Sequence, residues 1–184
     1  ATGMFSVIRN GLVTLHSYAA PADGEMVCTQ IIETSNRLIL VDAQLLLPYA
    51  HEVRQYADRL GKPIDRVYIT HAHPDHWMGL EVFKDRPLYA LGETIEELSK
   101  IGDYLLQLKQ STLGDLVPAT QVLPSHSVTP GEEIIDGVKF RFTKVYDSES
   151  PLLLLMDLPE QKVVVAQDIV YNRVYPCVGE KNAK

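Results

Sequence analysis

Three histidines and an aspartate lie within six consecutive positions of the stretch "YITHAHPDHWMG", as His71, His73, Asp75 and His76. Half of the chain's six histidines are in this one stretch. The proline after His73 disfavours helical backbone there, which predicts an extended segment where His71 and His73 point the same way. The turn at this proline then brings Asp75 and His76 to a neighbouring point. Two adjacent groups of imidazole and carboxylate donors are typical of zinc, and less selectively of iron or manganese.

A polar surface loop is the alternative interpretation of this cluster. Imidazoles that converge beside a buried strand end would repel one another when charged, and they would gain nothing in stability. The pattern therefore favours metal binding over a surface loop.

The elements that must position the cluster indicate a mixed α/β protein. Alternating and β-branched residues with short turns predict strand pairs within 4–18 and 26–42. Apolar residues at helical spacing, with a proline in the first turn, predict a helix at 45–60. Residues 65–70 form the predicted strand that leads into the histidines. A further helix is expected at 92–109, with a core-facing stripe of Ile95, Leu98, Ile101, Leu105 and Leu108.

The second half of the chain is predicted to be strand after strand, at 121–124, 132–146, 151–159 and 162–168. Two sheets packed face to face, with helices outside, would bury these apolar runs.

Composition limits the classes of protein. A chain of 184 residues with 46% hydrophobic residues is expected to form one domain over 1–184. The formal net charge is -7, without a basic stripe, so neither nucleic acid nor a membrane surface is expected as a partner. The apolar runs are far shorter than the roughly 20 residues that span a bilayer. A cytoplasmic protein is the expectation.

The pattern His-x-His-x-Asp-His after an apolar strand resembles the signature of the metallo-β-lactamase superfamily. "IIETSNRLILVDAQ", which contains Asp42, resembles the hairpin before that signature, and "LPEQKVVVAQD" resembles a later strand that ends in a metal-bridging aspartate, here Asp168. The resemblance implies a four-layer αββα sandwich with a dinuclear site that holds two zinc ions. It assigns His71 and His73 to one ion, Asp75 and His76 to the other, and Asp168 to both.

The chain departs from the family pattern at two ligands. Where members usually carry a further histidine, "TKVYDSESPLLLL" offers Asp147 as the best-placed substitute, although this aspartate could simply open a turn. Two histidines with a carboxylate would also suit iron. The family's last histidine is absent from the sixteen residues after Asp168. We expect missing C-terminal elements or a second metal completed by water. An uncovered sheet edge would also favour a homodimer.

The predicted activity is hydrolysis of a small-molecule ester, thioester, lactone, lactam or related substrate by a metal-bound hydroxide. Asp75 is the predicted catalytic residue, because it would orient the attacking group as well as bind metal. The alternative is a non-hydrolytic metal-binding or redox relative with an incomplete site.

Overall fold

The protein is built from two sheets that face each other. The computed structural model describes residues 1–146 and 152–165. Seven strands in the order β1 to β7 form the first sheet, and four in the order β11-β10-β9-β8 form the second. The first sheet comprises β1 (Met4–Asn10), β2 (Val13–Ala19), β3 (Cys28–Glu33), β4 (Leu38–Val41), β5 (Ile64–Tyr68), β6 (Leu88–Leu91) and β7 (His126–Val128). The second comprises β8 (Gly131–Ile135), β9 (Val138–Val145), β10 (Leu153–Leu158) and β11 (Val163–Val165).

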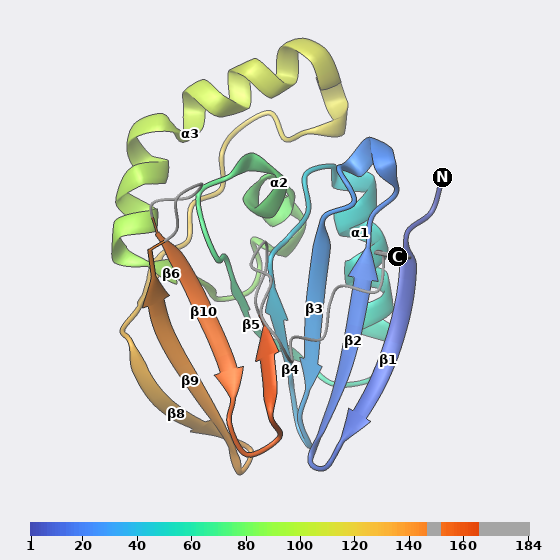
Figure 1. Ribbon diagram of the computed structural model, residues 1–184. Coiled ribbons are helices and arrows are strands. Elements are labelled where there is room, and N and C mark those ends of the chain that lie inside the picture. Colours follow the sequence, from blue (N-terminus) through green and yellow to red (C-terminus); the bar gives the residue numbers. More distant parts are fainter. Residues whose placement is uncertain (147–151, 166–184) are drawn as a thin grey trace, which may run out of the picture.

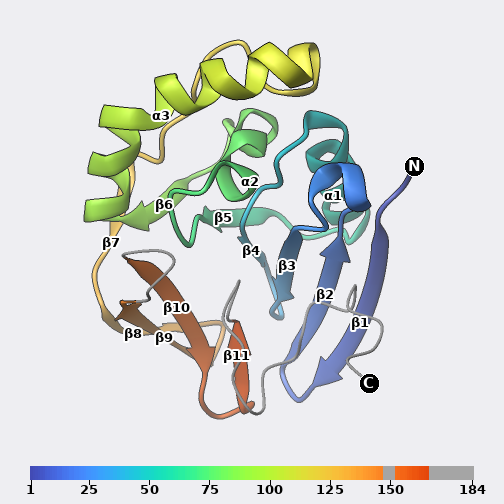
Figure 2. The same ribbon diagram turned by 45° about the horizontal axis from the view of Figure 1, so that its top comes forward.

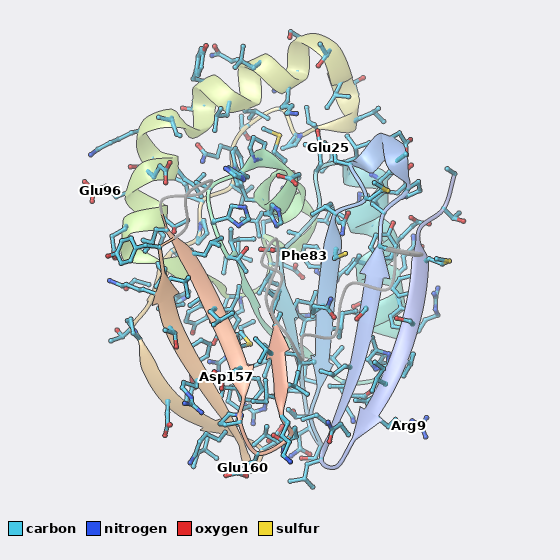
Figure 3. All side chains as sticks on the ribbon, viewed as in Figure 1. Arg9, Glu25, Phe83, Glu96, Asp157 and Glu160 are labelled. Atoms are coloured by element: carbon cyan, nitrogen blue, oxygen red, sulfur yellow. The ribbon has the colours of Figure 1, made fainter. Side chains whose placement is uncertain are left out.

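The helices cover the outer face of the first sheet, while the second sheet lies against its inner face (Figures 1 and 2). They are α1 (Leu47–Arg59), α2 (Pro74–Trp77) and α3 (Gly92–Leu113), with 3-10 turns η1 (Ala22–Gly24), η2 (Met78–Phe83) and η3 (Gly114–Leu116). One apolar cluster fills the space under the helices, and another lies between the sheets. Figure 3 shows Arg9, Glu96 and Glu160 pointing outward, whereas Phe83 is fully buried. The mixed α/β sandwich predicted from the sequence is confirmed.

The first sheet changes character at β4. Strands β1 to β4 pair antiparallel through the two predicted hairpins, and β4 to β7 pair parallel through helical crossovers. The carboxyl ends of β4 and β5 therefore meet at one edge of the sheet. Open α/β sheets bind ligands at such an edge, and the histidine cluster follows β5 there.

The prediction of a strand at 121–124 is wrong. Regular strand pairing in this part of the chain begins only at His126. Pro124 lacks the N–H that a ladder needs. The Gln121 side chain instead donates a 3.2 Å hydrogen bond to the Leu98 carbonyl in α3. This segment therefore supports α3 rather than extending the sheet.

The core-facing stripe of α3 also differs from the prediction. Leu98 is buried, but Ile101 is 38% exposed and Leu108 is 49% exposed. The buried positions of the helix are Thr94, Leu98, Gly102 and Leu106. A Cβ at Gly102 would lie 2.0 Å from the Gln121 amide nitrogen, so this glycine is what lets the chain approach α3. Packing of the Gln121 side chain against Gly102 thus helps to determine which face of α3 is buried.

Within the described residues, no helix has both the length and the apolar character needed to cross a bilayer.

Candidate metal centre

The candidate metal centre is formed by the segments that follow β4 and β5. Asp42 directly follows β4, and its backbone N–H donates to the Tyr68 carbonyl at 2.7 Å. Thr70 and His71 lie two and three residues after the end of β5, and the Thr70 carbonyl accepts a 2.8 Å hydrogen bond from the Leu154 N–H of β10. The cluster is therefore held by both sheets. His71 and His76 are each only 1% exposed, which contradicts the surface-loop interpretation for these two residues, whereas His73 is exposed.

The backbone around His73 has the predicted conformation. His73 is extended, with φ -67° and ψ 135°, and it immediately precedes α2, whose first residue is Pro74. The expected turn is thus a short helix that carries Asp75 and His76. The buried Trp77 indole N–H donates to the Ala72 carbonyl at 2.8 Å, which holds the segment between β5 and α2 in place.

The four clustered side chains form two pairs of donor atoms. His71 Nε2 lies 3.1 Å from His73 Nδ1, and His76 Nε2 lies 3.2 Å from a carboxylate oxygen of Asp75. Ligand atoms that are each about 2.1 Å from a tetrahedral zinc ion are about 3.4 Å apart. Both spacings are close to that value. The His71 and His76 rings are adjacent, with their centroids 4.1 Å apart, so the two pairs are neighbours.

Asp42 sets the orientation of two of these imidazoles from a fully buried position. One carboxylate oxygen accepts a 2.7 Å hydrogen bond from His76 Nδ1 and a 2.9 Å bond from the Thr70 hydroxyl. The Thr70 oxygen then accepts from His71 Nδ1 at 2.9 Å. Because both Nδ1 atoms carry protons in this arrangement, both Nε2 atoms carry the lone pairs that a metal requires.

Close backbone contact secures the position of Asp42. Asp42 has a φ of 67°, in the left-handed region that aspartate tolerates better than most residues. The next residue, Ala43, donates its N–H to the His76 carbonyl at 2.9 Å. A Cβ at Gly79 would lie 1.8 Å from the Ala43 carbonyl oxygen, so only glycine fits there. The loop after β4 and the helix that carries the ligands are thus held as one unit.

The structure brings together four of the six predicted metal ligands. Asp147 and Asp168 lie outside the described residues, so their assignment remains a prediction. Within residues 1–146 and 152–165, no three His, Cys, Asp or Glu side chains are grouped in a way that could hold a metal ion. The described donors instead form two pairs, each of which needs further ligands. The imidazole and carboxylate chemistry and the spacing of the pairs fit zinc.

The positioning role of Asp42 was not predicted from the sequence, nor was that of Thr70. The pattern identified Asp42 only as the end of a hairpin. The signal in the sequence is an aspartate directly after the apolar run "LILV". A carboxylate at the end of a buried strand needs a polar partner inside the protein. The Thr70 hydroxyl carries no such signal, because its role depends on Asp42 being near.

The fold and the candidate site together are an α/β sandwich with paired imidazole and carboxylate donors at its strand ends. The profile of the metallo-beta-lactamase superfamily matches residues 27–180. The alkyl/aryl-sulfatase BDS1 of Saccharomyces cerevisiae is 26% identical over 178 residues, which cover 77% of this chain and 28% of the yeast protein. The chain thus spans little more than a quarter of that relative.

Solved structures share the fold. A metallo-beta-lactamase from Pontibacter korlensis has a TM-score of 0.64 at 16% identity, over 88% of this chain and 70% of its own. FIM-1 from Pseudomonas aeruginosa, solved in its mono-zinc form, has a TM-score of 0.62 at 18% identity, over 89% and 68%. A double mutant of the sec-alkyl sulfatase PisA1 has a TM-score of 0.63 at 23% identity, over 89% and 30%. The chain belongs to the metallo-beta-lactamase superfamily.

Proposed function

We propose that this protein is a metal-dependent hydrolase of a small-molecule ester, thioester, lactone, lactam or related compound. The observation that carries this proposal is the pair of donor spacings, 3.1 Å between His71 and His73 and 3.2 Å between His76 and Asp75. The family supports hydrolysis, since the similar proteins include lactamases and alkyl sulfatases. Two of the similar proteins, at 26% and 23% identity, are named as sulfatases. A sulfate ester is therefore the first substrate to test.

The proposed site holds two zinc ions. His71 and His73 would bind one ion, Asp75 and His76 the other, with Asp147 and Asp168 as the further proposed ligands. When bound, the metal would lower the pKa of a water molecule and polarise the oxygen of the scissile group. No serine or cysteine nucleophile is needed for that chemistry.

The chain's own residues orient and hold the reacting groups. Asp42 and Thr70 present the imidazole lone pairs, as their hydrogen bonds to Nδ1 require. The Asp75 side chain is 23% exposed, whereas that of His76 is 1% exposed. Asp75 is therefore the described carboxylate that can accept a hydrogen bond from an attacking water, and we propose it as the catalytic residue.

A substrate panel with matched variants tests the proposal. The zinc-loaded protein is assayed with an aryl sulfate, a thioester, a lactone and a chromogenic cephalosporin. We expect turnover of at least one compound, its loss on addition of a chelator, and its return with zinc. The double variant His71→Ala, His73→Ala should be inactive, and the surface variant Asp103→Asn should retain full activity. Activity that survives the double variant would exclude the proposed mechanism.

Metal content separates hydrolysis from the redox alternative. Elemental analysis of the purified protein should give two zinc ions per chain. One iron per chain would instead favour a redox relative, and a protein that binds no added zinc would contradict the proposal.

A further inference from the structure

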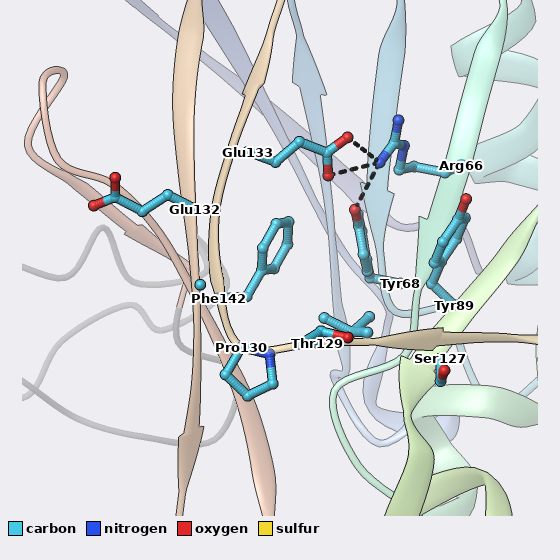
Figure 4. Close-up of a pocket in the computed structure, with 11 residues that line it drawn as sticks. Arg66, Tyr68, Tyr89, Ser127, Thr129, Pro130, Glu132, Glu133 and Phe142 are labelled. Carbon is cyan, nitrogen blue, oxygen red and sulfur yellow. Dashed lines mark hydrogen bonds and ion pairs between the residues drawn. The ribbon is translucent and has the colours of Figure 1, made fainter.

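A pocket of about 380 Å³ lies where the chain crosses from the first sheet to the second. Strands β5, β6 and β7 supply one side, and β8 and β9 supply the other (Figure 4). Its volume falls within the range of sites that bind small molecules, about 300 to 1,000 Å³. None of the four described candidate ligands, His71, His73, Asp75 and His76, lines this pocket, so it is distinct from the donor pairs that they form.

The interior of the pocket is aromatic. The Tyr68 ring centroid lies 5.4 Å from that of Tyr89 and 5.2 Å from that of Phe142. The exposed residues Ser127 and Thr129 place hydroxyl groups at the mouth. Burial raises the pKa of Tyr68 to about 12, so its hydroxyl stays a neutral hydrogen-bond donor. Tyr68 contacts both of the other rings, and the half-buried Tyr89 is the most accessible of the three to a flat aromatic ligand.

One end of the pocket carries an ion pair between the sheets. The Arg66 guanidinium lies 3.1 Å from both carboxylate oxygens of Glu133, and the dashed lines in Figure 4 mark these contacts. Arg66 also donates to Asp65 at 2.6 Å and to the Tyr68 hydroxyl at 3.1 Å, and its side chain is 14% exposed. The Glu133 side chain, in contrast, is 45% exposed.

The two charges therefore differ in how firmly they are held. Arg66 keeps two protein partners when Glu133 turns away, because Asp65 and Tyr68 remain bonded to it. Because the Glu133 side chain is 45% exposed, its ion pair with Arg66 contributes little, and a ligand anion can replace Glu133 at small cost. Arg66 is therefore the fixed charge at this end of the pocket, and a negative group is the one that can take the place of Glu133 on it.

We propose that this pocket binds a small aromatic carboxylate, with its ring against Tyr68, Tyr89 and Phe142 and its carboxylate on Arg66 in place of Glu133. A guanidinium presents parallel N–H donors that match a carboxylate. This inference does not depend on the hydrolase activity.

A titration with matched ligands tests the proposal. Benzoate, benzamide and benzylamine share a ring and differ in charge. Each is added to the isotope-labelled protein with a chelator present, which keeps benzoate from binding through a metal ion. We expect saturable amide shifts at residues 127–133 with benzoate, at least tenfold weaker binding of benzamide, and none with benzylamine. Equal binding of benzoate and benzylamine, or no saturable shift with benzoate, would overturn the proposal.

Variants of the ion pair give a second test. Glu133→Gln removes the competing carboxylate, and benzoate should bind about two- to fivefold more tightly. Glu132→Gln is the matched control, because the Glu132 carboxylate points away from Arg66 in Figure 4, and affinity should change less than twofold. Arg66→Gln should weaken benzoate about 10- to 100-fold. Weaker binding to Glu133→Gln would contradict the proposal even if Arg66→Gln fails to fold.

Discussion

Asp42 influences two candidate zinc ligands from one buried position. Its carboxylate bonds His76 directly and His71 through the Thr70 hydroxyl. Partners of this kind fix the tautomer and the ring orientation of metal-binding histidines. The free energy of metal binding should therefore depend on Asp42, although the residue contributes no ligand to either donor pair.

Asp42→Asn should weaken zinc binding by about 10- to 100-fold, because an amide can donate to His76 Nδ1 and favour the wrong tautomer. Competition with a chromophoric chelator measures the affinity. Thr70→Val, which removes only the relay to His71, should also weaken binding. Thr70→Ser keeps the hydroxyl and serves as the control, so an equal loss in the Ser and Val variants would contradict the hydrogen-bond relay.

At the scale of elements, the unit formed by the loop after β4 and helix α2 depends on Gly79. We expect Gly79→Ala to destabilise the protein by about 1 to 3 kcal/mol, because its Cβ would lie 1.8 Å from the Ala43 carbonyl and backbone would have to move. Urea unfolding measures the change. Gly92→Ala is the control, since its Cβ would meet nothing closer than 4.0 Å, and it should change stability by less than about 0.5 kcal/mol.

A second connection between elements joins the sheets at the end away from the metal centre. Asp136, in the turn between β8 and β9, accepts hydrogen bonds from Thr34 at 2.6 Å, the Asn36 N–H at 3.2 Å and Arg37 Nε at 3.1 Å. These residues belong to the β3–β4 turn of the other sheet. Hydrogen bonds from Thr34 first, and then from Asn36 and Arg37, lower the pKa of Asp136 to about 2.

Asp136 should therefore make stability depend on acid pH. The unfolded aspartate has a pKa of about 3.9. A lowered pKa in the folded state adds stability that is fully present above pH 4 and lost as pH falls toward 2. Asp136→Asn, which tolerates the same backbone, should lower the urea midpoint at pH 7 and lower it about half as much at pH 3. A midpoint difference that is independent of pH would exclude the charge as its cause, and Asp103→Asn provides the control.

At the scale of the whole molecule, metal binding should stabilise the fold, because the candidate centre is bonded to both sheets. Zinc at 100 times its dissociation constant should add about 2.7 kcal/mol and raise the melting temperature by roughly 5 to 10 °C. Differential scanning calorimetry with and without chelator measures this. In the double variant His71→Ala, His73→Ala, zinc should raise the melting temperature only slightly. A full rise in melting temperature would mean that zinc binds elsewhere.

Self-association is also a property of the whole molecule. In the described part of the first sheet, β1 pairs only with β2, and its other edge is open. Open strand edges pair readily with another chain. We predict a homodimer, which sedimentation velocity over a range of protein concentrations would detect. A monomer at the highest concentration would contradict this prediction.

The sequence by itself determined the paired strands, the helices at 45–60 and 92–109, and the convergence of His71 with His73. These features depend on local periodicity and on the conformation that a proline imposes on its neighbour. Local rules act within a few residues, so one chain segment is enough to predict them.

Only the tertiary structure decided the contacts between distant segments. Asp42 meets His76 from 34 residues away, and Thr34 meets Asp136 from 102 residues away. The buried face of α3 likewise depends on Gln121 reaching Gly102, which no helical periodicity indicates. Such contacts follow from the packing of whole elements, because shape and buried hydrogen bonding become known only when the sheets are assembled.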